Sequence, residues 1–90
     1  MITINKTKNF VDLYDPKKLT YQNIFPIIDE ILSKSISSGL GVYARVYKSP
    51  NPRTMLSTIR FELLYPDSKD EQGDALTFLK GIVSEVFEKF

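Results

Sequence analysis

The sequence predicts an α+β domain, a small β-α-β-β-α sandwich in which two helices pack on one face of a three-stranded, mainly antiparallel sheet. Two patterns carry this prediction. Alternating runs at residues 41–48 and 53–65 flank a turn with two prolines and an asparagine, which is typical of a β-hairpin. Apolar residues recur at helical spacing over residues 24–36 and 75–90. A chain of 90 residues is expected to form one domain, residues 1–90.

The N-terminal part of the chain is predicted to hold one short strand followed by a loop. Over residues 1–6, Ile2 and Ile4 alternate with polar residues, which favours a strand with one buried face. Residues 7–20 are polar and rich in turn-forming residues, and we expect them to be irregular. Three side chains of this segment are expected to hold it against the core: Phe10, Leu13 and Tyr14.

The first helix is expected to begin at Asn23, or at Pro26 because a residue before proline is pushed away from helical angles, and to end before Gly39. The side-chain oxygen of Asn23 can accept a hydrogen bond from a free backbone N–H, and Pro26 would then lie in the first turn, where its missing N–H costs little. Gly39 suits the left-handed position that ends many helices. The apolar stripe of this helix comprises Ile24, Ile27, Ile28, Ile31, Leu32 and Ile36.

The hairpin is predicted to bury its aliphatic side chains and to expose aromatic and basic ones. A four-residue loop at 49–52 would pair Lys48 with Arg53 and place Val42 opposite Ile59. A register shifted by one residue is disfavoured, because it would turn the aliphatic side chains outward. In the preferred register the opposite face displays Tyr43, Arg45, Tyr47 and Arg60.

The second helix is predicted to start with a capping box, in which Ser68 caps the first turn and Glu71 reaches back to it. Its core stripe comprises Ala75, Leu79, Ile82, Val83, Val86 and Phe90. Three phenylalanines exceed what one stripe can bury, and we expect them to favour self-association: Phe78, Phe87 and Phe90. A homodimer could also form by pairing of the hairpin's outer strand with its copy.

The composition argues against most catalysis. The chain has no cysteine and no histidine, which removes thiolate nucleophiles, imidazole bases and the usual zinc ligands. We therefore expect no catalytic residue, no metal and no cofactor, although a small enzyme with Glu62 as its base is an alternative. The letters of residues 39–44 match a dinucleotide-binding motif, but they follow a predicted helix instead of a strand. No apolar run has the length of a membrane span or signal peptide, and we expect a cytoplasmic protein.

The exposed hairpin face is the candidate binding surface. Its expected partner-binding residues are Tyr43, Arg45, Tyr47, Lys48, Arg53 and Arg60. Tyrosine and arginine are enriched at the energetic centres of protein interfaces. The sequence therefore predicts a non-enzymatic protein–protein interaction module with a larger protein partner. Its size and its lack of catalytic groups fit a virus- or mobile-element-encoded inhibitor of a larger host protein complex.

The alternative is a nucleic-acid-binding module that uses the same hairpin face. Tyrosine rings can stack on exposed bases, and guanidinium groups can neutralise phosphates. Residues 1–60 carry nine Lys and Arg against four Asp and Glu, which would suit this partner. The motifs of the common RNA-binding domains are missing from the sequence, so this alternative depends on the hairpin face alone.

Overall fold

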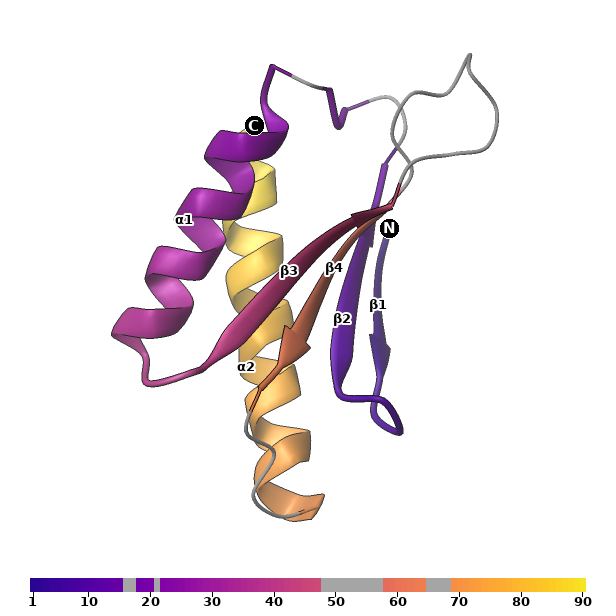
Figure 1. The fold of residues 1–90 in the computed structure, drawn as a ribbon, viewed down its shortest axis with the longest axis vertical. Coiled ribbons are helices and arrows are strands. Elements are labelled where there is room, and N and C mark those ends of the chain that lie inside the picture. Colours follow the sequence, from indigo (N-terminus) through magenta and orange to yellow (C-terminus); the bar gives the residue numbers. More distant parts are fainter. Residues whose placement is uncertain (16–17, 21, 48–57, 65–68) are drawn as a thin grey trace.

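The computed structural model describes residues 1–15, 18–20, 22–47, 58–64 and 69–90. The elements in chain order are β1 (Ile2–Asn5), β2 (Phe10–Tyr14), α1 (Ile24–Ser37), β3 (Val42–Tyr47), β4 (Thr58–Leu63) and α2 (Lys69–Glu88) (Figure 1). The strands form a four-stranded antiparallel sheet in the order β1-β2-β4-β3. The prediction of a small α+β fold is confirmed, and the predicted number of strands is wrong.

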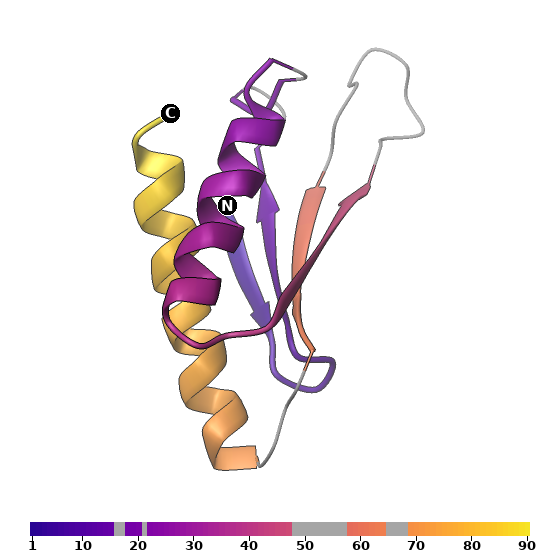
Figure 2. The ribbon, with the colours of Figure 1, turned by 60° about the vertical axis from the view of Figure 1, so that its left-hand side comes forward.

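Both helices lie on one face of the sheet, and the core fills the space between the two layers (Figures 1 and 2). The sheet contributes fully buried side chains from β2 and β4, which are Val11, Leu13, Ile59 and Phe61. The helices contribute Ile27, Ile31, Leu76, Leu79, Val83 and Val86. These positions alternate along the strands and recur every three or four residues along the helices, so hydrophobic periodicity determines which face each element buries. Among the described residues, no helix is long and apolar enough to cross a membrane.

Strand β2 lies in the segment that was predicted to be a loop. A tight turn joins it to β1: the Asn5 side chain accepts a hydrogen bond from the Lys8 backbone N–H (3.0 Å), and Asn9 adopts a left-handed conformation with φ 59°. Asparagine tolerates this conformation better than most residues. The turn returns the chain antiparallel to β1, where Leu13 is buried as expected but Tyr14 faces outward with 45% of its surface exposed.

The register of the β3–β4 hairpin also differs from the predicted one. Val42 pairs with Leu63 instead of Ile59, and Ile59 pairs with Val46. The difference is an even number of residues, so each side chain keeps its predicted face and the alternation is confirmed. The predicted pairing of Lys48 with Arg53 lies outside the described residues.

Helix α1 begins where the sequence indicates, but not by the predicted cap. Asn23 precedes the first helical residue, yet its side chain makes no capping hydrogen bond. Its amide oxygen instead accepts from the Thr20 backbone N–H (2.8 Å), and its amide nitrogen donates to the Lys18 carbonyl (2.7 Å). Asn23 therefore stabilises the loop that leads into the helix, and Pro26 lies in the first turn as expected.

The buried stripes of the two helices differ from the prediction near their ends. In α1, Ser35 is fully buried and its hydroxyl donates to the Ile31 carbonyl (2.7 Å), whereas Ile36 is 71% exposed. In α2, Leu76 is fully buried and Phe90 is 41% exposed. The predicted capping box of the second helix lies outside the residues whose side chains are described. Burying Ser35 costs little because its hydroxyl stays hydrogen-bonded.

Replacing each of two glycines by alanine is expected to change the free energy of unfolding in opposite directions. Gly39 ends α1 with φ 80°, and nothing lies within 4 Å of a Cβ placed there, so Gly39→Ala pays a purely conformational cost. We expect it to lower the free energy of unfolding by about 1 kcal/mol. Gly81 lies inside α2 with equally open space, and Gly81→Ala should raise that free energy by about 0.5–1 kcal/mol. Urea denaturation of both variants checks this, and equal shifts of the same sign would contradict it.

Candidate functional site

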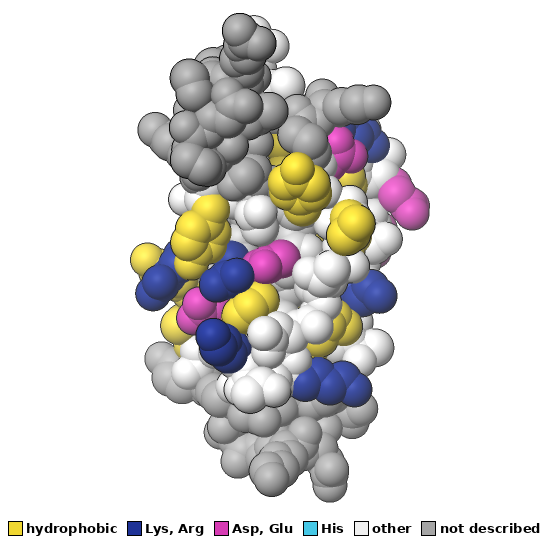
Figure 3. All heavy atoms as spheres, turned by 90° about the vertical axis from the view of Figure 1, so that its right-hand side faces the viewer, with side chains coloured by type: hydrophobic (Ala, Val, Ile, Leu, Met, Phe, Trp, Pro, Cys, Tyr) yellow, Lys and Arg dark blue, Asp and Glu magenta, His cyan; other side chains and the backbone are white. Residues whose placement is uncertain are grey.

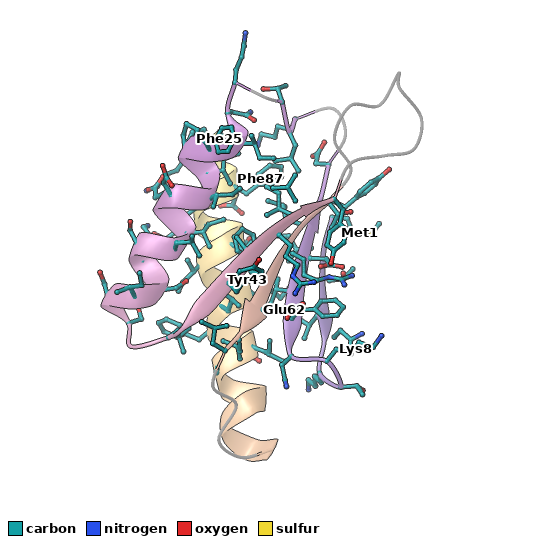
Figure 4. The ribbon with its side chains drawn as sticks, viewed as in Figure 1. Met1, Lys8, Phe25, Tyr43, Glu62 and Phe87 are labelled. Atoms are coloured by element: carbon teal, nitrogen blue, oxygen red, sulfur yellow. The ribbon has the colours of Figure 1, made fainter. Side chains whose placement is uncertain are left out.

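The sheet face opposite the helices, which we call the open face, brings most of the predicted binding residues together. Tyr43, Arg45 and Tyr47 extend from β3, and their neighbours on β4 are Glu62, Arg60 and Thr58. Strand β2 adds a third column that the sequence did not predict. Across β2, β4 and β3 the rows are Phe10–Glu62–Tyr43, Asp12–Arg60–Arg45 and Tyr14–Thr58–Tyr47. Figure 4 shows Tyr43 and Glu62 extending from these neighbouring strands.

Arg60 is held firmly within the open face. Its Nε donates to Asp12 Oδ1 (2.8 Å) and its Nη2 to Asp12 Oδ2 (3.1 Å), and only 28% and 18% of the two side chains are exposed. The guanidinium carbon lies 3.7 Å from the centre of the Phe10 ring and 4.9 Å from that of Tyr47. The hydrogen bonds that Arg60 donates to Asp12 raise the pKa of Arg60 above its usual value. Arg60 therefore joins β2 to β4 and covers Phe10, which is buried although it points away from the helices.

Arg45 is the exposed cation of the open face. Its guanidinium carbon lies 5.3 Å from the centre of the Tyr43 ring. A hydrogen bond with Tyr47 is the largest cause that raises the pKa of Arg45, and the nearby charge of Glu62 adds to it. Arg45 pairs directly with Arg60 across the strands, and this like-charge pair is offset by Asp12 and Glu62.

The charges of the open face balance each other. Two guanidinium groups, Arg45 and Arg60, lie among two carboxylates, Asp12 and Glu62. On the side of the molecule that Figure 3 presents, described basic and acidic side chains are interspersed with apolar ones, and neither sign gathers into a patch. The field above this face is therefore weak compared with that of a surface that binds phosphates.

Three tyrosines form the accessible aromatic part of the open face. Tyr43, Tyr14 and Tyr47 are 48%, 45% and 38% exposed. Tyr14 was missed as a candidate because its segment was interpreted as a loop. Val11 and Leu13 are apolar and two residues apart, which is the spacing of a strand with one buried face. This pattern could have predicted that Tyr14 lies on the opposite face, beside Tyr43 and Tyr47.

The remaining predicted residues are placed elsewhere or lie outside the described part. Lys48 and Arg53 belong to the residues that are not described. Phe78 is 53% exposed on α2, about 13 Å along the helix from Phe87. Phe87 is partly buried, and the Lys18 Nζ lies 4.6 Å from its ring centre and donates to its carbonyl (3.2 Å). The three phenylalanines that were expected to favour self-association therefore do not form one exposed patch.

The described residues hold no candidate metal site. Among them, no three acidic side chains lie close enough together to hold a metal ion. Glu62 pairs with Tyr43 and Phe10 across the strands, on an open sheet face. No protein-family model matches the chain, and no curated protein or solved structure is detectably similar to it. The function is therefore argued from the geometry of the open face.

Proposed function

We propose that this protein is a non-enzymatic interaction module that binds a larger protein through the open face of its sheet. The observation that carries the proposal is the group of three exposed tyrosines, Tyr14, Tyr43 and Tyr47, on a face with balanced charge. Tyrosine provides a large contact area and a hydrogen-bonding hydroxyl while losing little side-chain entropy on binding. Such residues dominate the binding energy of many protein interfaces.

The rigidity of the open face supports the same proposal. Tyr47 packs against the Arg60 guanidinium, which is also paired with the Asp12 carboxylate. The Arg45 guanidinium lies over the Tyr43 ring, 5.3 Å from its centre. A preorganised surface loses less conformational entropy on binding, so more of the contact energy appears as affinity.

A nucleic-acid partner fits this face less well. Binding to phosphates gains its free energy from cations that are free to replace counterions. Arg60 is already paired with Asp12, and Arg45 lies in the field of Glu62. Lys6 and Lys8 are exposed at the β1–β2 turn, at the end of the face where the row with Tyr43 lies, and away from Tyr14 and Tyr47. The test below must therefore distinguish binding to a nucleic acid from binding to a protein.

The partner that we propose is a host protein complex, which this chain would inhibit as a product of a virus or mobile element. A small chain that lacks histidine and cysteine acts more readily by occupying a surface than by chemistry. An inhibitor of this kind needs one rigid face with tyrosine anchors and no cofactor.

The proposal predicts that Tyr14→Ala combined with Tyr43→Ala abolishes capture of the host partner. Both side chains are about half exposed, so the fold should be retained while binding weakens by about 2 kcal/mol or more, roughly thirtyfold. The measurement is a pull-down from the host, followed by titration of the captured protein by calorimetry. Phe78→Ala, which removes an equally exposed ring from α2, is the matched control and should bind normally.

Two results would contradict the proposal. Unchanged affinity of the double variant would show that the open face is not the contact surface. Capture that disappears after nuclease treatment, or that weakens steeply between about 50 and 200 mM salt, would show a nucleic-acid partner instead.

A further inference from the structure

Strand β3 forms an edge of the sheet, and no described strand pairs with its outer side. The Leu64 backbone N–H donates to the Gly41 carbonyl (2.9 Å), so Gly41 and Leu64 are a hydrogen-bonded pair of the β3–β4 ladder. This pair determines which residues of β3 form hydrogen bonds with β4 and which do not. Residues at every second position then bond to β4, while the intervening ones direct their N–H and C=O groups outward. The outward groups belong to Val42, Ala44 and Val46. This edge can therefore accept a further strand.

Exposed apolar side chains adjoin this edge on the helix side of the sheet. Val46 is 41% exposed at the far end of β3, although it shares its face with buried residues. On α1, Phe25 and Ile36 are 65% and 71% exposed, and Leu32 is partly exposed between them. These three helix residues fall within about 40° of one another around the helix axis, so they form one stripe.

The apolar stripe of α1 faces away from α2. The opposite flank of α1 carries Lys34 and Glu30, which pair with Glu85 on α2 (2.9 Å) and with Lys89 directly after α2 (2.8 Å). These two residues lie roughly 140–180° from the stripe around the helix. Because α1 contacts α2 on one side and β3 on the other, the stripe lies on the β3 side of the molecule.

Helix α1 and strand β3 separate from each other with distance from their connection. The two elements are joined at residues 38–41, and from this connection they diverge toward the far end of β3 (Figures 1 and 2). Ile36 therefore lies near the start of β3, whereas Phe25 and Val46 lie at the diverging ends.

We propose that a second copy of this chain covers this surface, with the two β3 strands pairing antiparallel around Ala44. This register places Val42 opposite Val46 of the second copy, and it places Tyr43 opposite Arg45 of the second copy. The first pair buries the exposed valine, and the second is a cation–π pair that occurs twice. The two sheets become one continuous sheet of eight strands.

The neighbouring registers are less favourable. Centring the pair on Arg45 would place this guanidinium directly against its own copy, which is destabilising. Centring it on Tyr43 would place Arg45 opposite Gly41 and would leave the guanidinium without an aromatic partner across the interface. The register around Ala44 is therefore selected by the chemistry of the edge itself, which favours a second copy as the occupant.

The same two-fold axis joins the helix stripes. It brings the start of the second copy's β3 beside the end of the first one, and Ile36 lies near that start. Ile36 of the second copy then approaches Val46 and Phe25, which are exposed in the single chain. All three of these exposed apolar residues become buried in one interface.

Dimerisation would place two open faces side by side on the same surface of the continuous sheet. A partner with two binding sites would then be held at both, which increases the overall affinity without new contacts. This inference does not depend on the proposed function, since the dimer forms from purified protein without a partner.

The test is the mass of the purified protein by sedimentation equilibrium, at concentrations up to roughly 0.5 mM, where micromolar association is complete. We expect a dimer. Tyr43→Lys should weaken it at least about tenfold, because the new ammonium faces Arg45 of the second copy. Adding Arg45→Glu to this variant should restore the dimer, because the new charges then attract each other across the axis. This rescue is specific to the register around Ala44.

A second pair of variants separates this interface from one on α2. Ile36→Lys should give a monomer with an unchanged circular dichroism spectrum, since this side chain is 71% exposed. Phe78→Lys, a matched substitution on α2, should leave the dimer intact. A monomeric wild-type protein, a failed rescue by the double variant, or a dimer lost only with Phe78→Lys would each overturn the proposal.

Discussion

Arg60→Ala is expected to lower the free energy of unfolding by about 2–3 kcal/mol. The Arg60 and Asp12 side chains are partly buried, and their bidentate ion pair lies between two strands that are far apart in the sequence. Truncating the arginine leaves the Asp12 carboxylate partly desolvated without a partner, which costs more than the loss of an exposed ion pair. It also uncovers Phe10, whose ring the guanidinium shields from water.

A double-mutant cycle isolates the contribution of this pair. Asp12→Ala and Arg60→Ala together should cost about 1–2 kcal/mol less than the sum of the single changes. The matched control is Lys34 with Glu85, an ion pair between the helices in which the carboxylate is 64% exposed. That pair should show a much weaker coupling, because water already solvates it. Urea denaturation measures the coupling free energy in both cycles. Equal values would show that Asp12 and Arg60 are not coupled through a desolvated contact.

The importance of Arg60 for the fold changes how the binding surface must be probed. Its guanidinium supports Tyr47 by packing against that ring. A binding defect in an Arg60 variant would therefore mix the loss of a contact with a rearrangement of the surface. Tyr14 and Tyr43 are better probes, because both are about half exposed.

The sequence predicted the parts of the fold that follow from local periodicity. The stripes of α1 and α2 and the alternation of β3 and β4 each repeat over many residues, so the buried face of each could be identified. The hairpin register could not, because an even shift leaves every side chain on the same face. Hydrophobic burial alone does not distinguish such registers.

Strand β2 was missed because its sequence is short and its central residue is charged. Phe10–Tyr14 has five residues, and Asp12 in its middle is unfavourable in a strand taken by itself. The structure satisfies Asp12 with Arg60 from β4, a partner 48 positions later in the chain. Neither this pairing nor the charge balance of the open face that results from it can be obtained from local patterns, because both depend on which strands are neighbours.

Two adjacent residues of β2 give the sharpest test of this strand. Leu13→Ala should lower the free energy of unfolding by about 2–5 kcal/mol, because it leaves a cavity where a fully buried side chain contacts the core. Tyr14→Ala should change it by less than about 1 kcal/mol, because the ring is 45% exposed on the opposite face. Urea denaturation of the two variants measures the difference. For a domain of this size the first loss is a large part of the total stability.

The contrast between these neighbours links the fold to the proposed function. A strand turns consecutive side chains to opposite faces, so Leu13 belongs to the core and Tyr14 to the open face. Tyr14→Ala should therefore weaken partner capture with the fold intact, whereas Leu13→Ala should weaken it only to the extent that the protein unfolds. If both changes are mild, residues 10–14 are a loop and not a strand. If Tyr14→Ala destabilises the protein as much as Leu13→Ala, the tyrosine belongs to the core and is no contact residue.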